Sequence, residues 1–113
     1  MEYKVRTQNE AKIIELTGAL DLHSASDAGA LFRETLDANP PLLIIDLSEL
    51  QYLKSSGYQA LVELVKRSEE RDIPVAIVGP HEGIRAIMKV FRLDVFFPVY
   101  DSVEDALESI SSE

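Results

Sequence analysis

Two adjacent serines, Ser55 and Ser56, are the residues of this sequence best placed to do chemistry. With Gly57 they stand between an aliphatic run and an amphipathic pattern, which predicts that a buried strand and a short polar connector precede them and that they lead into a helix. The free amides and the macrodipole of a helix N-terminus favour an anion, so a phosphate on Ser55 would be tolerated there. A serine that simply caps the helix explains the same residues without any phosphate, and on these residues alone both interpretations stay open.

Other catalytic patterns are missing from the sequence. Ser55 lies in no GxSxG elbow, and the chain has neither a GxxxxGK[ST] loop nor a GxGxxG turn. His23 and His81 are isolated histidines, whereas a zinc ion needs three or four converging ligands. We therefore expect a protein that is not an enzyme and that holds no metal and no cofactor.

Asp46 raises a competing hypothesis, because it follows an aliphatic strand as the phosphoacceptor of a phospho-aspartate receiver module does. Such a site needs Mg²⁺ held by several carboxylates together, and the first strands offer only the isolated Glu15 and Asp21. The last predicted strand also has no lysine to stabilise a phosphate. Asp46 is therefore predicted to be a strand-end residue that caps loop amides.

The elements that position these residues follow from the apolar patterning. Alternating or unbroken apolar runs predict strands at residues 3–7, 12–17, 42–47, 74–78 and 95–100. Spacing of three and four residues predicts helices at residues 24–37, 58–71, 84–91 and 103–110, and a frayed tail at residues 111–113. The alternation indicates an α/β fold, a mixed central sheet of four to five strands with about four helices packed against it.

Composition narrows the class of protein further. The 113 residues suit a single domain, residues 1–113, and a net charge of −9 disfavours nucleic acid and anionic membrane surfaces as partners. The chain has no cysteine, no apolar run of transmembrane length and no apolar stretch of the signal-peptide kind at its start. We expect a cytoplasmic protein, and its oligomeric state is not predicted.

Three segments, in order and spacing, resemble the STAS domain (sulfate transporter and anti-sigma factor antagonist). Residues 16–21 (LTGALD) are similar to the motif after the family's second strand. Residues 43–48 (LIIDLS) and 55–57 (SSG) are similar to its strand and Asp-Ser-x-Gly segment, and residues 96–107 to its closing strand and helix. The similarity covers essentially the whole chain and is greatest to the free-standing bacterial anti-sigma factor antagonists, which implies a STAS-like fold.

The resemblance implies a regulatory function. Ser55, with Ser56 as second choice, would be phosphorylated by a partner that is both an anti-sigma factor and a serine kinase. The unphosphorylated chain would bind that partner and so release a sigma factor, and phosphorylation would end the binding. The residues implied in partner binding are Asp21, Lys54, Ser55, Ser56, Gly57 and Tyr58.

Lys54 departs from the family pattern, which has an aspartate before the phosphorylated serine. The amine could pair with a phosphate on Ser55, it could be a solvated charge with no role, or the switch could be lost. A chain without the switch would be a STAS scaffold, such as an accessory subunit of a lipid-transporting ATPase or part of a larger signalling assembly. A third class, a ligand-binding or enzymatic module, would use a pocket between Asp21 and Ser55.

Overall fold

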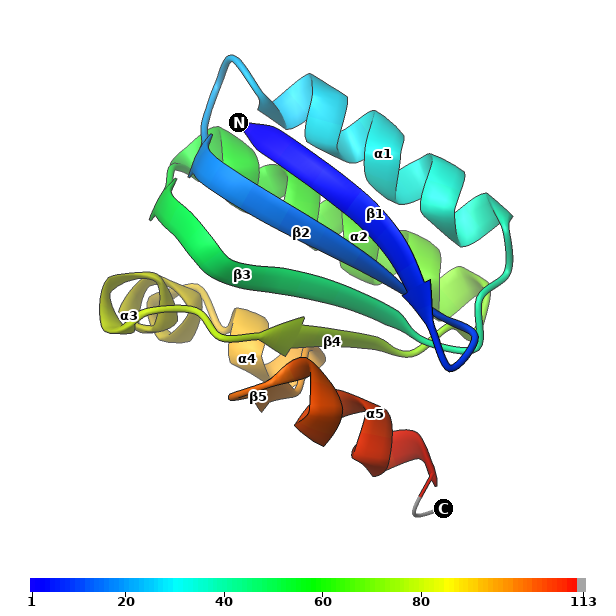
Figure 1. Ribbon diagram of the computed structural model, residues 1–113. Coiled ribbons are helices and arrows are strands. Elements are labelled where there is room, and N and C mark those ends of the chain that lie inside the picture. The colour runs from blue at the N-terminus through cyan, green and yellow to red at the C-terminus, as the bar shows by residue number, and fades with distance from the viewer. Residues whose placement is uncertain (112–113) are drawn as a thin grey trace.

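A five-stranded mixed sheet runs through the computed structural model, which describes residues 1–111 (Figure 1). Neighbouring strands follow the order β1-β2-β3-β4-β5, with β1 and β2 antiparallel and the other pairs parallel. The strands are β1 (Glu2–Gln8), β2 (Ala11–Leu20), β3 (Leu43–Leu53), β4 (Val75–Val78) and β5 (Val99–Tyr100). The predicted fold class is therefore confirmed.

Helices cover the sheet on both faces. Side chains from α1 to α4 join one face of the sheet in a large apolar core, and α5 packs against the other face in a smaller one (Figure 1). The helices are α1 (Ala25–Asp37), α2 (Ser55–Glu70), α3 (Glu82–Val90), α4 (Leu93–Phe96) and α5 (Val103–Ser111). Within residues 1–111 none of them is both long and apolar enough to cross a membrane.

The aliphatic start of β3 reflects burial on both faces. Leu43 and Ile45 enter the large core, whereas Ile44 between them enters the small core under α5. All three are fully buried. A strand covered on both faces needs apolar side chains at every position, which is the pattern that the sequence shows.

β3 is longer than predicted, because the segment expected to be a polar connector continues as strand to Leu53. Its buried residues, Leu47, Leu50 and Leu53, recur at every third position rather than every second. The β2–β3 register shifts twice in this region, which breaks the alternation on which the prediction relied. The extension pairs Leu53 with Leu20, so β2 and β3 end side by side.

The strand predicted at residues 95–100 is wrong in its first half. Leu93–Phe96 forms the short helix α4, and only Val99 and Tyr100 pair with β4. The amide of Phe97 donates to the carbonyl of Leu93 (3.0 Å), and both of these side chains are buried. The apolar run thus contains one helical turn with Val95 and Phe96 facing solvent. Of the tail predicted to fray, residues 112–113 lie outside the described part of the chain.

Candidate functional site

Ser55 is the first residue of α2 and is exposed. It follows the end of β3 with Lys54 between them. Its hydroxyl makes no hydrogen bond to any residue among 1–111, and neither does that of the half-buried Ser56. The fold therefore presents a free hydroxyl at the start of a sixteen-residue helix.

The prediction that a serine caps α2 is wrong. The N-cap position is taken by Lys54, whose backbone is extended and whose side chain accepts no hydrogen bond from the described residues. The cause lies in the long β3: the amide of Lys54 donates to the carbonyl of Leu20 (2.9 Å), which keeps the chain extended for one more residue. The helix then begins at Ser55, whose hydroxyl does not cap the helix.

Gly57 brings α2 against the end of β2. A Cβ at this position would lie 2.5 Å from both the carbonyl oxygen and Cγ of Leu20, closer than packed atoms tolerate. Gly57 thus permits a close approach of the Leu20 backbone. The contact fixes the first turn of α2, and with it Ser55, beside the loop that follows β2.

Asp21 lies in that loop, and its carboxylate supports the loop itself. Oδ1 accepts hydrogen bonds from the amides of His23 (3.0 Å) and Ser24 (3.2 Å) and lies 3.2 Å from the hydroxyl of Ser24. Desolvation raises the pKa of Asp21, but the bonds from Ser24 and His23 and the charge of His23 outweigh it, so the pKa is lowered. Asp21 is thus a charged, fixed group beside the Lys54–Ser55 segment.

Lys54 and Tyr58 frame Ser55 on either side. The exposed Lys54 amine lies 5.3 Å from the ring centroid of Tyr52, within the range of a cation–π contact. The Tyr58 ring stacks at 34° on the ring of Phe91, with centroids 4.3 Å apart. Neither Tyr52 nor Phe91 was predicted as a site residue; the helical spacing of residues 84–91 placed Phe91 in the core, yet it is 45% exposed.

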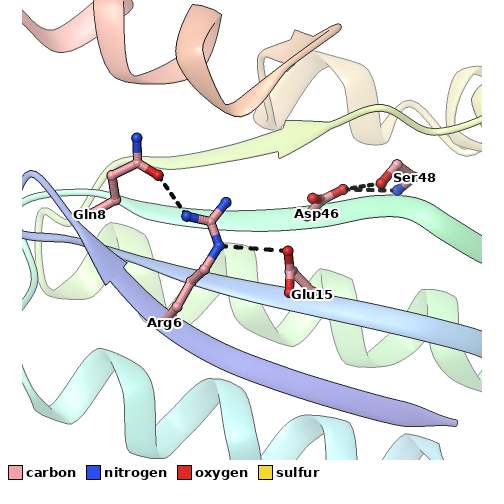
Figure 2. Close-up of polar contacts among 5 residues, drawn as sticks. All are labelled: Arg6, Gln8, Glu15, Asp46 and Ser48. Atoms are coloured by element: carbon pink, nitrogen blue, oxygen red, sulfur yellow. Dashed lines mark hydrogen bonds and ion pairs between the residues drawn. The ribbon is translucent and has the colours of Figure 1, made fainter.

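Two further groups of polar contacts lie on the sheet and are drawn in Figure 2; Ser55 belongs to neither. Arg6 pairs with Glu15 (3.6 Å) and donates to Gln8 (2.6 Å). Asp46 accepts from the amide (2.9 Å) and the hydroxyl (2.7 Å) of Ser48. Asp46 does bind a backbone amide as predicted, but it lies inside β3 and not at the end of the strand.

Among residues 1–111, no three histidines or carboxylates gather into a group that could hold a metal ion. A shallow hollow of about 260 Å³ lies between α1 and α2 and includes Ser56 in its lining. Its other walls come from Ala25, Gly29, Phe32 and neighbouring helix residues. The arrangement around Ser55 is thus an exposed surface with a free hydroxyl, suited to modification or to contact with another protein.

Curated relatives and solved structures resemble the whole chain. The anti-sigma-F factor antagonist RsfB of Mycobacterium tuberculosis is 24% identical over 106 residues, which are 94% of this chain and 86% of RsfB. The crystal structure of an anti-sigma factor antagonist from Mycobacterium paratuberculosis has a TM-score of 0.88 at 23% identity, over 97% of this chain and 93% of that one.

The anti-sigma factor antagonist SpoIIAA is similar in two forms. Its unphosphorylated form has a TM-score of 0.82 at 16% identity, over 99% of this chain and 98% of that one. The phosphorylated form, from Bacillus, has a TM-score of 0.75 at 17% identity, over 96% of this chain and 99% of that one. These likenesses show the fold. The STAS domain model matches residues 2–106, and the chain therefore belongs to the STAS domain family.

Proposed function

We propose that this chain is an anti-sigma factor antagonist, a cytoplasmic regulator that binds an anti-sigma factor and thereby releases a sigma factor. The observation that carries the proposal is the free, exposed hydroxyl of Ser55 at the start of α2. The names of its relatives, RsfB and the antagonist from Mycobacterium paratuberculosis, support the same role. The partner-binding residues are those that surround this hydroxyl: Asp21, Lys54, Ser55, Ser56, Gly57 and Tyr58.

Phosphorylation of Ser55 by the anti-sigma factor, acting as a serine kinase, switches the binding off. SpoIIAA has been solved in a phosphorylated and an unphosphorylated form, which makes a phosphoswitch reasonable for a chain of the same fold. The kinase supplies the ATP, so this chain is a substrate and has no catalytic residues of its own. Ser55 is favoured over Ser56 because Ser55 is exposed and Ser56 is half-buried.

The physical effect of the switch is electrostatic. A phosphate adds about −1.5 to −2 charges and three strong acceptors to a surface that must be desolvated when the partner docks. A loss of about 3–4 kcal/mol in binding free energy corresponds to a weakening of two to three orders of magnitude, since about 1.4 kcal/mol is tenfold in Kd.

The test compares aspartate at two helix starts. The chain is first used as bait in an extract of its own cell, and captured proteins are identified by mass spectrometry. Binding of the captured anti-sigma factor is then measured for wild type, Ser55→Asp and Ser102→Asp. Ser102 accepts a hydrogen bond from the amide of Asp105 at the start of α5, across the sheet from α2. We expect Ser55→Asp alone to lose at least about a hundredfold in affinity; equal affinities of wild type and Ser55→Asp would refute the switch.

Lys54 supports a second candidate, a STAS scaffold that binds its partner without a phosphoswitch. A lysine stands where the family has an aspartate, and its exposed amine changes the charge that a kinase meets beside Ser55. The intact mass of the chain isolated from its own cell separates the candidates. One added phosphate that maps to Ser55 favours the switch, whereas an unmodified chain bound to a transporter ATPase or a signalling assembly favours the scaffold.

A further inference from the structure

α3 lies at the same end of the sheet as the start of α2, beyond the carboxyl ends of β3 and β4 (Figure 1). His81, the N-cap of α3, contacts the carbonyl of Gln51 in β3 through Nε2 (2.9 Å). At the other end of α3, Phe91 stacks on Tyr58. The amide of Tyr58 donates to the carbonyl of Lys54 (2.9 Å), so this stack lies one helical turn from Ser55. The surface around Ser55 therefore continues onto α3.

This surface is apolar and is not covered by the rest of the chain. Phe91 is 45% exposed and Val90 is 75% exposed, although both belong to residue types that are normally buried. Leu22, in the loop after β2, is exposed as well. Exposed apolar side chains beside an aromatic contact such as that of Tyr58 with Phe91 mark contact surfaces, and aromatic residues are the usual energetic anchors of such contacts.

The same surface is cationic, against the sign of the chain as a whole. Lys54, Lys89 and Arg92 are exposed, and within residues 1–111 none of them pairs with a carboxylate. The first turn of α2 carries no acidic residue. Asp21 beside Lys54 and the exposed Asp94 after Arg92 offset two of these three charges. A chain with a net charge of −9 thus keeps a small positive excess beside the exposed Phe91.

We infer that residues 89–92, together with Lys54 and Tyr58, form the anchoring part of the surface that binds the anti-sigma factor, and that the matching surface of this partner is apolar and acidic. The inference rests on the proposed function and adds to it the charge of the partner's surface. The net charge of −9 alone would instead predict a basic partner surface. It also explains the direction of the switch. A phosphate on Ser55 turns the small positive excess into a negative charge and repels the partner's carboxylates.

Two matched pairs of variants test the anchor and the charge by titration calorimetry with the purified anti-sigma factor captured by the wild-type chain. For the anchor, Phe91→Ala is compared with Phe96→Ala. Phe96 is 55% exposed and lies near Val65 and Pro74, at the far end of α2. For the charge, Lys89→Glu is compared with Lys4→Glu, the same charge change on the exposed edge strand β1.

We expect Phe91→Ala to weaken binding at least about tenfold and Lys89→Glu about fivefold, with both controls within about twofold of wild type. Raising the NaCl concentration should weaken wild-type binding and leave Lys89→Glu less sensitive. Val90→Asp serves as a second anchor variant, because its exposed position carries little of the fold. It should bind at least about tenfold more weakly with an unchanged melting temperature.

The outcomes separate this inference from the function on which it rests. If the wild-type chain captures no anti-sigma factor, the proposed function fails and the inference fails with it. If wild type binds but Phe91→Ala and Val90→Asp bind equally well, the anchor is refuted and the proposed function stands. If Lys89→Glu and Lys4→Glu weaken or strengthen binding alike, only net charge matters, and the acidic partner surface is refuted.

Discussion

α2 and α3 each follow a parallel strand of the sheet, yet their first turns are built differently. At α3, Nδ1 of His81 accepts from the amides of Gly83 (3.0 Å) and Ile84 (3.4 Å), while Nε2 contacts the carbonyl of Gln51. At α2, the N-cap is Lys54, a residue whose side chain has no acceptor, and the hydroxyl of Ser55 makes no hydrogen bond within residues 1–111. The first-turn amides of α3 are thus capped by a side chain of the same chain, whereas those of α2 have no side-chain cap and remain available to solvent and partners.

α2 is held in place by packing rather than by a side-chain cap. Its first turn is seated by the contact between Gly57 and Leu20 and by the backbone bond from Lys54 to Leu20. An end fixed in this way can expose its amides and a hydroxyl without losing its position. The open end of α2 is therefore compatible with a modification that changes charge and not fold.

The largest effect is expected for Gly57→Ala, which attacks the packing that seats α2. The new methyl group would lie 2.5 Å from the carbonyl oxygen of Leu20, so the helix or β2 must move, and the free energy of unfolding should fall by about 3 kcal/mol. Gly29→Ala in α1 is the matched control. Its methyl group would meet only the movable end of Arg33 at 3.4 Å, so urea unfolding should show no loss of stability.

His81→Ala should have the next largest effect, because it removes the cap of α3 and the contact with Gln51. We expect the free energy of unfolding to fall by about 2 kcal/mol. His81→Asn keeps an acceptor for the helix amides but is too short to contact the carbonyl of Gln51. Its free energy of unfolding should therefore fall by only about half as much as that of His81→Ala. Thermal unfolding of both variants measures the difference; equal losses would show that the capping bonds contribute nothing.

Lys54→Asp converts the open start of α2 into a capped one. An aspartate at the N-cap accepts from first-turn amides and is favoured by the helix dipole, so the free energy of unfolding should rise by about 1 kcal/mol. Lys54→Ala removes the same amine without adding an acceptor and should leave stability nearly unchanged. Equal stability of both variants would show that an aspartate does not cap α2.

With a cognate kinase, Lys54→Asp should also be phosphorylated faster than wild type, since it restores the family pattern.

Asp21→Asn should lower the stability at neutral pH and reduce the further loss of stability in acid. Because the folded state lowers the pKa of Asp21, its contribution is fully present above the ordinary pKa of 3.8 and is lost as the pH falls through the lower folded value. The asparagine variant lacks this contribution, so its stability should fall less steeply below pH 3.8. Chemical unfolding at a series of pH values checks this, and curves of identical shape would contradict it.

The sequence alone sufficed for the strand–helix junction at Ser55, because the aliphatic run of β3 and the helical spacing after Tyr58 are strong local signals. It did not suffice for the way in which the junction is built. The buried positions of Leu47, Leu50 and Leu53 depend on register shifts with β2, which no local pattern in β3 contains. The missing cap on α2 and the exposure of Phe91 likewise depend on tertiary contacts, which the local sequence does not contain.

The smallest effect should come from the residue with the largest proposed role. Ser55→Ala removes a hydroxyl that bonds to nothing within residues 1–111, so the free energy of unfolding should stay within about 0.5 kcal/mol of wild type. Ser24→Ala is the contrast: this buried hydroxyl accepts from the amide of Asp21 (2.9 Å) and lies 3.0 Å from the carbonyl of Ala19. Its loss should cost about 2 kcal/mol. If Ser55→Ala were as destabilising as Ser24→Ala, Ser55 would be a structural residue, and the open helix start would not be a surface kept free for a partner.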